Sequence, residues 1–168
     1  MIILRRLNLK KDISKKYLNW MNDLEVHKYT EQRYIKHSLV NIRKFVREKN
    51  KSKNEFLYGI FLKKKNLKIH IGNIKLGPIN FTHKTGEISY FIGEKKLWGK
   101  GYAALAIKKI NIIAKKMKLK KLKAGFYEMN IGSKKVLEKN NFKLEGSMKS
   151  EIIYKGKRCD LYLYGKIL

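Results

Sequence analysis

A six-residue segment with two glycines, Trp98-Gly99-Lys100-Gly101-Tyr102-Ala103, has the spacing best suited to bind an anion. It lies between an apolar run that ends at Gly93 and a long helical pattern. The first N–H groups of a helix have no intrahelical partner and lie at the positive end of its dipole. Since glycines let the backbone approach a ligand closely, the segment predicts a phosphate cradle. A helix that begins after an ordinary glycine turn is the alternative.

A second polar segment follows the apolar run 122–127. Asn130 and Ser133 are placed to cap the next helix, and their side chains could also reach a neighbouring ligand. Asn141 falls just after that helix, where a left-handed backbone is usual and Asn is tolerated. Capping alone is the simpler interpretation of each residue. The two segments together favour a ligand site.

The elements that must position these segments follow from hydrophobic periodicity. Apolar alternation predicts strands over residues 2–7, 56–62, 67–76, 86–93, 122–127, 152–154 and 160–167. Residues 63–66 are predicted to form a hairpin turn, and Gly77-Pro78 to end the strand before it.

Four helices are predicted between these strands. Ser14 and Ser38 are placed to cap the first two, and the second buries a stripe of Leu39, Ile42, Phe45 and Val46. The others span 101–118 and 133–140. The order β-α-α-β-β-β-α-β-α-β-β mixes hairpins with one crossover, so the fold class is α+β, with a mixed β-sheet flanked by helices in a single domain, 1–168.

The composition narrows the class of protein. A chain of 168 residues with 43% hydrophobic residues can form a core, which excludes a disordered chain. The net charge of +28 attracts anions, but 35 of the 41 basic residues are lysine, which is typical of a solvated surface. The single cysteine excludes an intramolecular disulfide, and the four histidines show no metal spacing. With neither a signal peptide nor an apolar membrane span, we expect a cytoplasmic protein.

Residues 86–146 resemble the core of the GNAT superfamily of acetyl-CoA-dependent N-acetyltransferases. The superfamily has an Arg/Gln-x-x-Gly-x-Gly/Ala loop, which Trp98 to Ala103 matches with Trp98 in the first place, and an Asn-x-x-Ser/Ala helix, matched by Asn130 and Ser133. Trp-Gly-Lys-Gly-Tyr-Ala is typical of the branch of ribosomal-protein N-terminal and amino-sugar acetyltransferases. The likeness to this branch extends over nearly the whole chain, through Arg5, the segment Trp20 to Asp23, residues 68–73 and Asp160.

The resemblance implies a site for acetyl-CoA as co-substrate, without a metal. Three segments are expected to contact it: the strand end Phe91, Ile92 and Gly93; the loop Trp98, Gly99, Lys100, Gly101, Tyr102 and Ala103; and the pair Asn130 and Ser133. One N–H group of the strand end is expected to polarise the thioester carbonyl.

The family reaction is direct attack of an amine on acetyl-CoA, which needs a base and a donor for the leaving thiolate. Glu87 is our first candidate for the base and His70 the second; an ion pair with a lysine and a structural role are their alternatives. Many relatives carry a tyrosine one turn beyond Ser133 as the acid, but this chain has Leu137. Ser133 is then the positional candidate, with an ordered water in support. Cys159 is not expected to act as a nucleophile.

The amine acceptor is expected to bind near the first two helices, at Trp20, Asn22, Tyr29, Arg33 and Tyr34, although ordinary packing would also explain each of them. A nucleotide-linked amino sugar is favoured slightly over a protein N-terminus, and a polyamine is disfavoured because the protein is cationic. A basic nucleic-acid-binding module without catalysis and a CoA-binding protein without activity are the alternatives. We expect no specific nucleic-acid or membrane partner and a monomer or homodimer.

Overall fold

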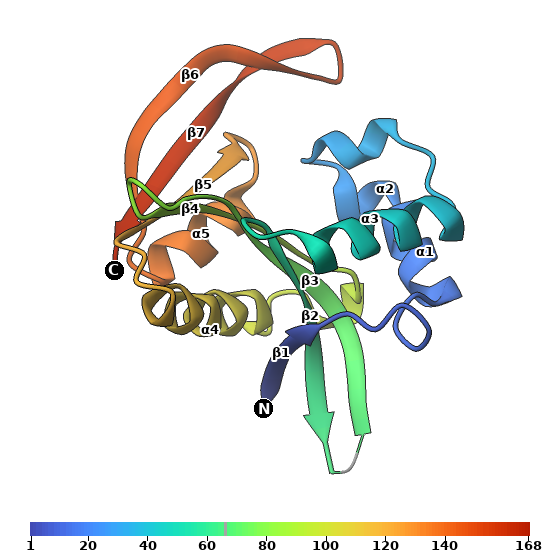
Figure 1. Cartoon of the computed structure of the whole chain (residues 1–168). Helices are drawn as coiled ribbons and strands as arrows, with labels where there is room; N and C mark the ends of the chain where they lie inside the picture. The colour runs from blue at the N-terminus through green and yellow to red at the C-terminus, as the bar shows by residue number, and fades with distance from the viewer. Residues whose placement is uncertain (66) are drawn as a thin grey trace.

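The computed structural model describes residues 1–65 and 67–168, and seven strands form one sheet in the order β1-β2-β3-β4-β5-β7-β6 (Figure 1). The strands are β1 (Ile2–Arg6), β2 (Phe56–Lys64), β3 (Leu67–Asn80), β4 (Thr85–Ile92), β5 (Lys121–Tyr127), β6 (Lys143–Tyr154) and β7 (Lys157–Ile167). The helices are α1 (Lys15–Met21), α2 (Leu24–His27), α3 (Leu39–Lys51), α4 (Tyr102–Lys116) and α5 (Ile131–Lys139), with short 3-10 turns η1 (Glu31–Tyr34) and η2 (Lys95–Leu97). This architecture confirms the predicted α+β class.

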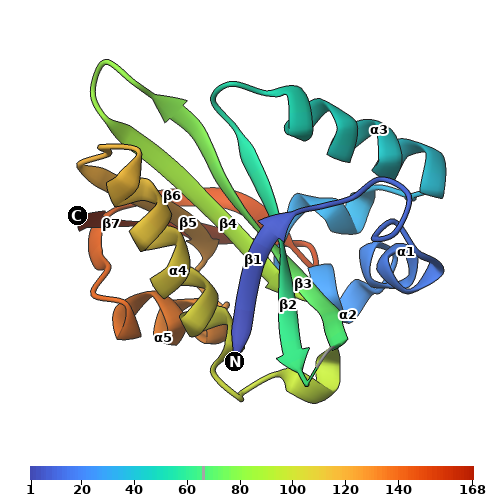
Figure 2. The ribbon, with the colours of Figure 1, turned by 60° about the horizontal axis from the view of Figure 1, so that its bottom comes forward.

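The helices cover the two faces of the sheet. Helices α1 to α3 lie on one face, and α4 and α5 lie together on the other (Figures 1 and 2). Alternate residues of β2 serve the two layers: Leu57 and Phe61 pack with α1 and α3, whereas Ile60 and Leu62 pack with α4. The sheet therefore separates two hydrophobic clusters, and a ligand that spans the sheet would have both layers within reach.

The sheet has one parallel pair, β4 with β5. Their pairing covers Thr85 to Glu87 opposite Lys121 to Lys123. Beyond these residues β4 continues to Ile92 beside β3, and β5 continues to Tyr127 beside β7. The two strands thus part after Glu87, and an opening forms in the middle of the sheet.

The helix boundaries follow the predicted capping chemistry. The Ser14 side chain accepts a hydrogen bond from the Tyr17 N–H, and Ser38 forms a capping box with Asn41. Asn130 caps α5, and Asn141 beyond its end has a φ of +61°. Each of these predictions is confirmed because the signal is local.

Two predictions are wrong: that Gly77-Pro78 ends strand β3, and that Phe45 belongs to the buried stripe of α3. Strand β3 continues through Gly77-Pro78 to Asn80, because Pro78 lies in a bulge between Leu76 and Ile79, where its missing N–H breaks no ladder bond. Phe45 is 41% exposed, because α3 buries only a narrow stripe centred on Ile42 and Val46.

Several element boundaries also differ, and one short helix was missed. Helix α5 begins at Ile131, two residues earlier than predicted, and α2 was not predicted because it is only one turn long. Strand β6 begins at Lys143 rather than at residue 152, because most of it is exposed and lacks the alternation that marks a half-buried strand. The hairpin between β2 and β3 is confirmed by the pairing of Lys64 with Leu67, while Asn66 of its turn lies outside the described residues.

The chain is tightly packed around Gly93, directly after the end of β4. A Cβ atom there would lie 2.2–2.6 Å from three ring atoms of Trp20, which is itself only 6% exposed. We therefore expect Gly93→Ala to lower the free energy of unfolding by about 1–3 kcal/mol, the usual range for overpacking. Urea denaturation measures it, with Gly125→Ala as control, since the nearest atom to a Cβ there is 3.7 Å away. Equal losses in the two variants would contradict this packing.

Candidate active site

The edge of β4 that faces the opening offers backbone groups to a ligand. The Gly93 N–H donates to the Ile71 carbonyl of β3 at 2.9 Å, so it is not available. Because alternate residues of a strand direct their backbone groups to opposite neighbours, Phe91 shares the direction of Gly93, whereas Tyr90 and Ile92 face the opening. Of the three predicted backbone contacts, the geometry thus favours Ile92, and it adds Tyr90.

The glycine loop lies directly after this strand end. The Trp98 indole Nε1 donates to the Ile92 carbonyl at 2.7 Å and fastens the loop to β4. Gly99 and Gly101 have φ values of +73° and +80°, and Gly101 is the N-cap of α4. No side chain of the described residues caps this helix, so its first N–H groups face outward. Lys100, Tyr102 and Ala103 complete the predicted anion cradle.

The predicted polar pair on α5 lies across the opening from β4. The Asn130 Oδ1 accepts from the Ser133 N–H at 3.0 Å, so this side chain caps the helix. The Ser133 hydroxyl lies 2.9 Å from the Tyr90 hydroxyl. Leu137, one turn farther, is fully buried in the core. The side chain of Ser133 is therefore linked to β4, a contact that the sequence did not reveal.

A cavity of about 520 Å³ lies on the α1–α3 face of the sheet. Its walls come from α1, α2, η1, α3 and strands β2 to β4. The residues that line it are aliphatic, aromatic or uncharged polar, apart from the cation Lys75: Tyr17, Met21, His27, Thr30, Gln32, Ile35, His37, Asn41, Ile42, Phe45, Leu57, Asn73, Lys75, Ser89, Tyr90 and Phe91. The cavity reaches β4 at Ser89 to Phe91, next to the opening.

His27 is a cavity residue that the sequence analysis missed. Its ring lies 4.9 Å from that of Phe91 and its Nδ1 lies 3.2 Å from the Thr30 hydroxyl, while its buried Nε2 has no partner within the described chain. Burial, together with nearby His37, lowers the pKa of His27 from 6.5 to about 4, although Asp23 opposes this. The imidazole is therefore neutral at pH 7. A single histidine in a one-turn helix carries no sequence signal of this kind.

The buried imidazole makes stability depend on pH. The unfolded chain protonates His27 near pH 6.5 and the folded protein only near pH 4, so the unfolded state binds more protons between these values and stability falls as the pH drops through them. This contribution reaches about 3 kcal/mol. We expect His27→Gln to lose less stability than the wild type between pH 7 and 4.5 in urea denaturation. Exposed His83→Gln is the control, and a wild-type slope in His27→Gln would contradict the assignment.

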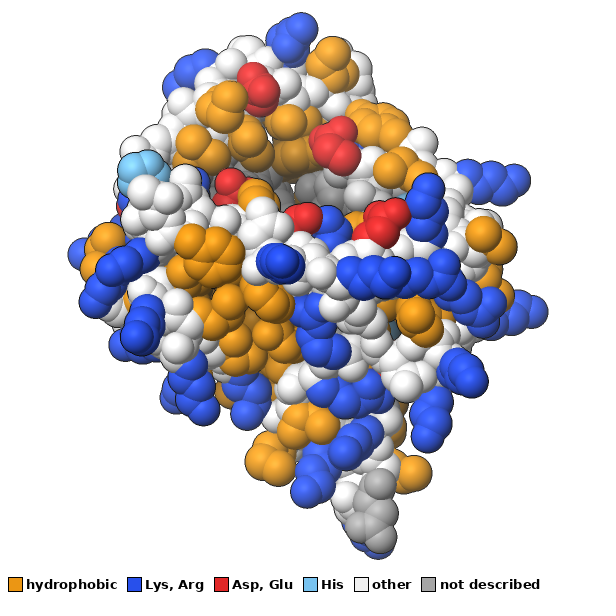
Figure 3. Space-filling model, in the orientation of Figure 1, with side chains coloured by type: hydrophobic (Ala, Val, Ile, Leu, Met, Phe, Trp, Pro, Cys, Tyr) orange, Lys and Arg blue, Asp and Glu red, His pale blue; other side chains and the backbone are white. Residues whose placement is uncertain are grey.

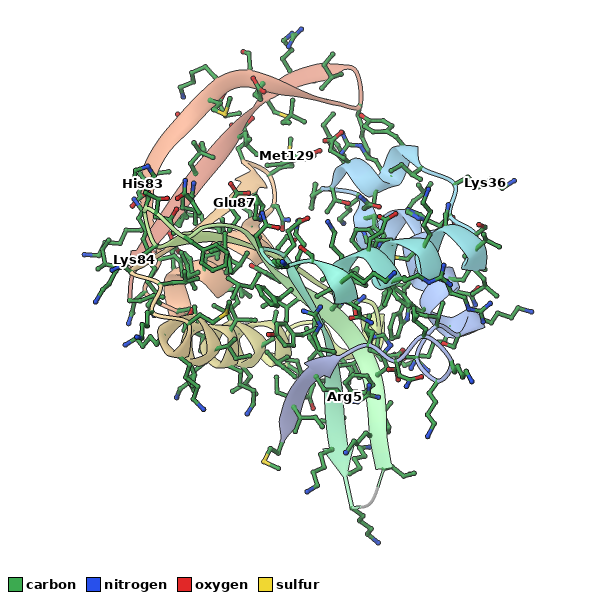
Figure 4. The ribbon with its side chains drawn as sticks, viewed as in Figure 1. Arg5, Lys36, His83, Lys84, Glu87 and Met129 are labelled. Atoms are coloured by element: carbon green, nitrogen blue, oxygen red, sulfur yellow. The ribbon has the colours of Figure 1, made fainter. Side chains whose placement is uncertain are left out.

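The two predicted bases occupy different places. Glu87 lies on β4 (Figure 4), where it is the last residue paired with β5 before the two strands part. Its side chain is 54% exposed, and its carboxylate lies 3.9 Å from the Lys123 ammonium. His70 is enclosed by the rings of Tyr17, Trp20 and Phe61, and its Nε2 lies 2.8 Å from the Asn73 Oδ1. Burial lowers its pKa. The structure brings Glu87 to the opening but places His70 in an aromatic cluster beside it.

The predicted acceptor residues divide into two groups. Tyr29, Arg33 and Tyr34 gather under the β6–β7 hairpin, where Arg33 Nη1 donates to the Tyr127 hydroxyl at 2.9 Å and Nη2 to the Ile153 carbonyl at 3.1 Å. A depression there is also lined by Glu31, Glu151 and Arg158. Figure 3 shows a hollow in this region with hydrophobic and acidic side chains on its rim.

Trp20 and Asn22 lie away from that group. Trp20 packs on Gly93 in the core, and Asn22 exchanges hydrogen bonds with the backbone of His37. Asn22 thereby fixes the position of a histidine that lines the cavity. Trp20 and Asn22 thus contact Gly93 and His37, respectively.

Cys159 is the single cysteine of the chain. Burial raises the pKa of the Cys159 thiol, whose Sγ lies 3.5 Å from the Ile152 carbonyl. No cluster of three or more metal-ligating side chains occurs among residues 1–65 and 67–168. Within those ranges no helix is long and apolar enough to cross a membrane.

The residues at the opening fit a CoA thioester. A free strand edge suits the amide-bearing pantetheine arm, and an uncapped helix start behind two glycines suits phosphates. A Cβ added at Gly99 or Gly101 would enter open space, so the surface in front of the loop is accessible. Loop and cavity lie on either side of the opening, so an amine in the cavity can meet a thioester held on β4.

Comparisons with known proteins agree with this geometry. Residues 2–143 match the family model described as acetyltransferase (GNAT) domain, whereas no curated protein matches the sequence. A GNAT-family acetyltransferase from Bacillus anthracis is 26% identical, with a TM-score of 0.81 over 99% of this chain and 94% of that one. A spermidine N-acetyltransferase from Vibrio cholerae, in complex with CoA and spermine, is 20% identical, with a TM-score of 0.85 over 99% and 95%.

Two further solved structures share the fold at 20% identity. The microcin C7 self-immunity acetyltransferase MccE, in complex with acetyl-CoA and AMP, has a TM-score of 0.83 over 99% of this chain and 92% of that one. RimL, a ribosomal L7/L12 α-N-protein acetyltransferase in complex with CoA, has a TM-score of 0.85 over 99% and 94%. Together with the opened sheet and the glycine loop, the match over residues 2–143 shows that the chain belongs to the GNAT family of acetyltransferases and is an acetyl-CoA-dependent N-acetyltransferase.

Proposed function

We propose that this protein transfers the acetyl group of acetyl-CoA directly to the primary amine of a nucleotide-linked amino sugar. The observation that carries the proposal is the parting of β4 and β5, with the glycine loop on one side and a cavity of about 520 Å³ on the other. The Tyr90 and Ile92 N–H groups are placed to polarise the thioester carbonyl. The amine attacks the thioester directly, so the reaction forms no acyl-enzyme; Cys159, the single thiol of the chain, is buried in β7.

The amine must be neutral when it attacks, so a group in the site must accept its proton. Glu87 is exposed at the apex of the opening and can act through a water molecule. His27 is neutral and lines the cavity beside Phe91. We propose Glu87 as the base, with His27 as the second candidate that the geometry supports.

The cavity favours a neutral, hydroxyl-rich ring as the acceptor. Its described lining residues include no carboxylate, whereas a polyamine needs anionic partners to replace its water. His27 Nε2, His37 Nε2 and Asn73 Nδ2 are buried without a partner in the described chain, and hydroxyl groups would satisfy them. Arg33 and Arg158 in the depression outside provide cations for the phosphates of a nucleotide.

A thiol-release assay with acetyl-CoA tests the proposal across nucleotide-linked amino sugars, N-terminal peptides and polyamines. We expect the highest kcat/KM with an amino-sugar nucleotide. Preference for a peptide would establish N-terminal acetylation instead, and preference for spermidine would overturn the argument from the cavity. Release with none of them, at saturating acetyl-CoA, would contradict the acceptor class.

The base is tested in the same assay. We expect Glu87→Gln to lower kcat by about a hundredfold, within the usual range for general-base catalysis, and to remove the acid limb of the pH profile. His27→Gln separates the second candidate. An unchanged rate and pH profile in Glu87→Gln would refute Glu87 as the base, and loss of the acid limb in His27→Gln alone would transfer that role to His27.

A further inference from the structure

The side chain of Tyr90 connects strand β4 to helix α5. Its backbone groups face the opening, the residue borders the cavity, and its side chain packs with the cluster on the α4–α5 face, where the hydroxyl lies 2.9 Å from the Ser133 Oγ on α5. The hydrogen bond therefore joins β4 to the helix that follows β5, across the gap between the two strands. We propose that Tyr90 is a positioning residue for the leaving group, because its hydroxyl donates to Ser133 and thereby directs the Ser133 hydroxyl proton toward the departing sulfur.

The direction of this hydrogen bond follows from the chemistry of the two groups. A phenol is the stronger acid, so we take the Tyr90 O–H as the donor; the Ser133 Oγ at 2.9 Å is a closer acceptor than the Ser133 carbonyl at 3.4 Å. The Ser133 N–H is already bound to the Asn130 Oδ1, which fixes the first turn of α5. The Ser133 O–H is then free to donate its hydrogen bond to a third group, the departing sulfur.

Tyr90 itself is not suited to surrender its proton. Burial raises its pKa to about 12, so the phenol stays protonated over the whole range in which a thiol titrates. It can therefore orient and polarise Ser133 at every working pH without changing its own charge. Leu137 is fully buried and offers no hydroxyl. Ser133, hydrogen-bonded to Tyr90 of β4, is therefore the residue of α5 whose hydroxyl can act as the donor at the opening.

The step balances without a proton transfer from Tyr90. As the amine nitrogen bonds to the acetyl carbon, the carbon–sulfur bond breaks and its electron pair remains on sulfur. The proton of the amine passes to the base, while the Ser133 hydroxyl donates a hydrogen bond to the thiolate. The thiolate takes up a proton from solvent. A hydrogen bond to a charged acceptor is roughly twice as strong as a neutral one, so it favours the leaving group specifically.

The inference rests on the proposed function, but its test does not require turnover. The thiol pKa of CoA bound to the protein is measured from thiolate ultraviolet absorbance across pH. We expect Tyr90→Phe and Ser133→Ala each to raise this pKa by about one unit, the tenfold effect of losing a hydrogen bond to a charged group, and the double variant to add little. Desulfo-CoA, which lacks the sulfur, should bind all variants equally by calorimetry.

Tyr164→Phe is the matched control. Its hydroxyl also bonds to α5, at the Glu138 Oε1 (3.2 Å), but near the opposite end of the helix. We expect this variant to leave the thiol pKa of bound CoA unchanged. An unchanged thiol pKa in Tyr90→Phe, or equal weakening of CoA and desulfo-CoA, would overturn the inference. Failure of the wild type to bind CoA would instead overturn the proposed cofactor site.

Discussion

Replacing Gly101 with glutamate will strongly weaken CoA binding while leaving the protein folded. The residue has a φ of +80°, which costs a residue with a Cβ about 1–2 kcal/mol. The added carboxylate would enter open space in front of α4, where we place the phosphates, and would repel them. The strain lowers stability in the free and the bound protein alike, whereas the repulsion acts on binding alone. Repulsion between like charges about 5–6 Å apart amounts to about 3 kcal/mol at a protein surface, so we expect CoA affinity to fall about a hundredfold by calorimetry.

Gly156 provides a matched control for this change. It has a φ of +75°, a Cβ there also enters open space, and it lies at the tip of the β6–β7 hairpin. Gly156→Glu carries the same backbone strain and the same added charge, so we expect wild-type affinity for CoA. Equal losses in both variants would mean that net charge, rather than the loop, governs binding.

Replacing Arg33 with alanine will impair use of the acceptor without affecting CoA. The guanidinium donates to the Tyr127 hydroxyl (2.9 Å), the Tyr34 hydroxyl (2.7 Å) and the Ile153 carbonyl (3.1 Å). It thereby joins η1 to the end of β5 and to the β6–β7 hairpin, which forms one wall of the depression outside the cavity. We expect kcat/KM for the acceptor to fall about a hundredfold, the cost of leaving such hydrogen-bonded partners unpaired.

Steady-state kinetics with varied acceptor measure this effect, and calorimetry measures the CoA affinity. Arg47→Ala, on the exposed side of α3, removes the same charge elsewhere and should leave both constants unchanged. A loss of CoA affinity in Arg33→Ala, or an unchanged kcat/KM for the acceptor, would show that the arginine does not shape the acceptor side.

The parts of the site that could be predicted from sequence are those made by local chemistry. The glycine loop, the Asn130 cap and the left-handed Asn141 each depend on a few neighbouring residues. The same holds for the Ser14 and Ser38 caps. Such signals survive because backbone geometry near a helix end is decided within one turn.

The parts that could not be predicted depend on distant segments meeting. Tyr90 and Ser133 are 43 positions apart, and Arg33 and Tyr127 are 94 apart. His27 becomes a cavity residue only because a one-turn helix packs against β4. No periodicity records such contacts, so the sequence alone could not reveal them.

Net charge proved a poor guide to the local field. The value of +28 permitted a nucleic-acid-binding module and argued against a cationic acceptor. Lys and Arg do cover much of the face seen in Figure 3, but Glu31 and Glu151 line the depression beside Arg33 and Arg158. The local field at the depression therefore depends on the few charges that line it rather than on the sum over the surface.

Hydrogen–deuterium exchange with and without CoA tests the central claim most directly. We expect CoA to protect two segments: the end of β4 at Tyr90 to Ile92, and the loop and first turn of α4 from Gly99 to Ala104. Protection confined to other segments, or no protection with CoA at millimolar concentration, would contradict a cofactor site between the parted strands.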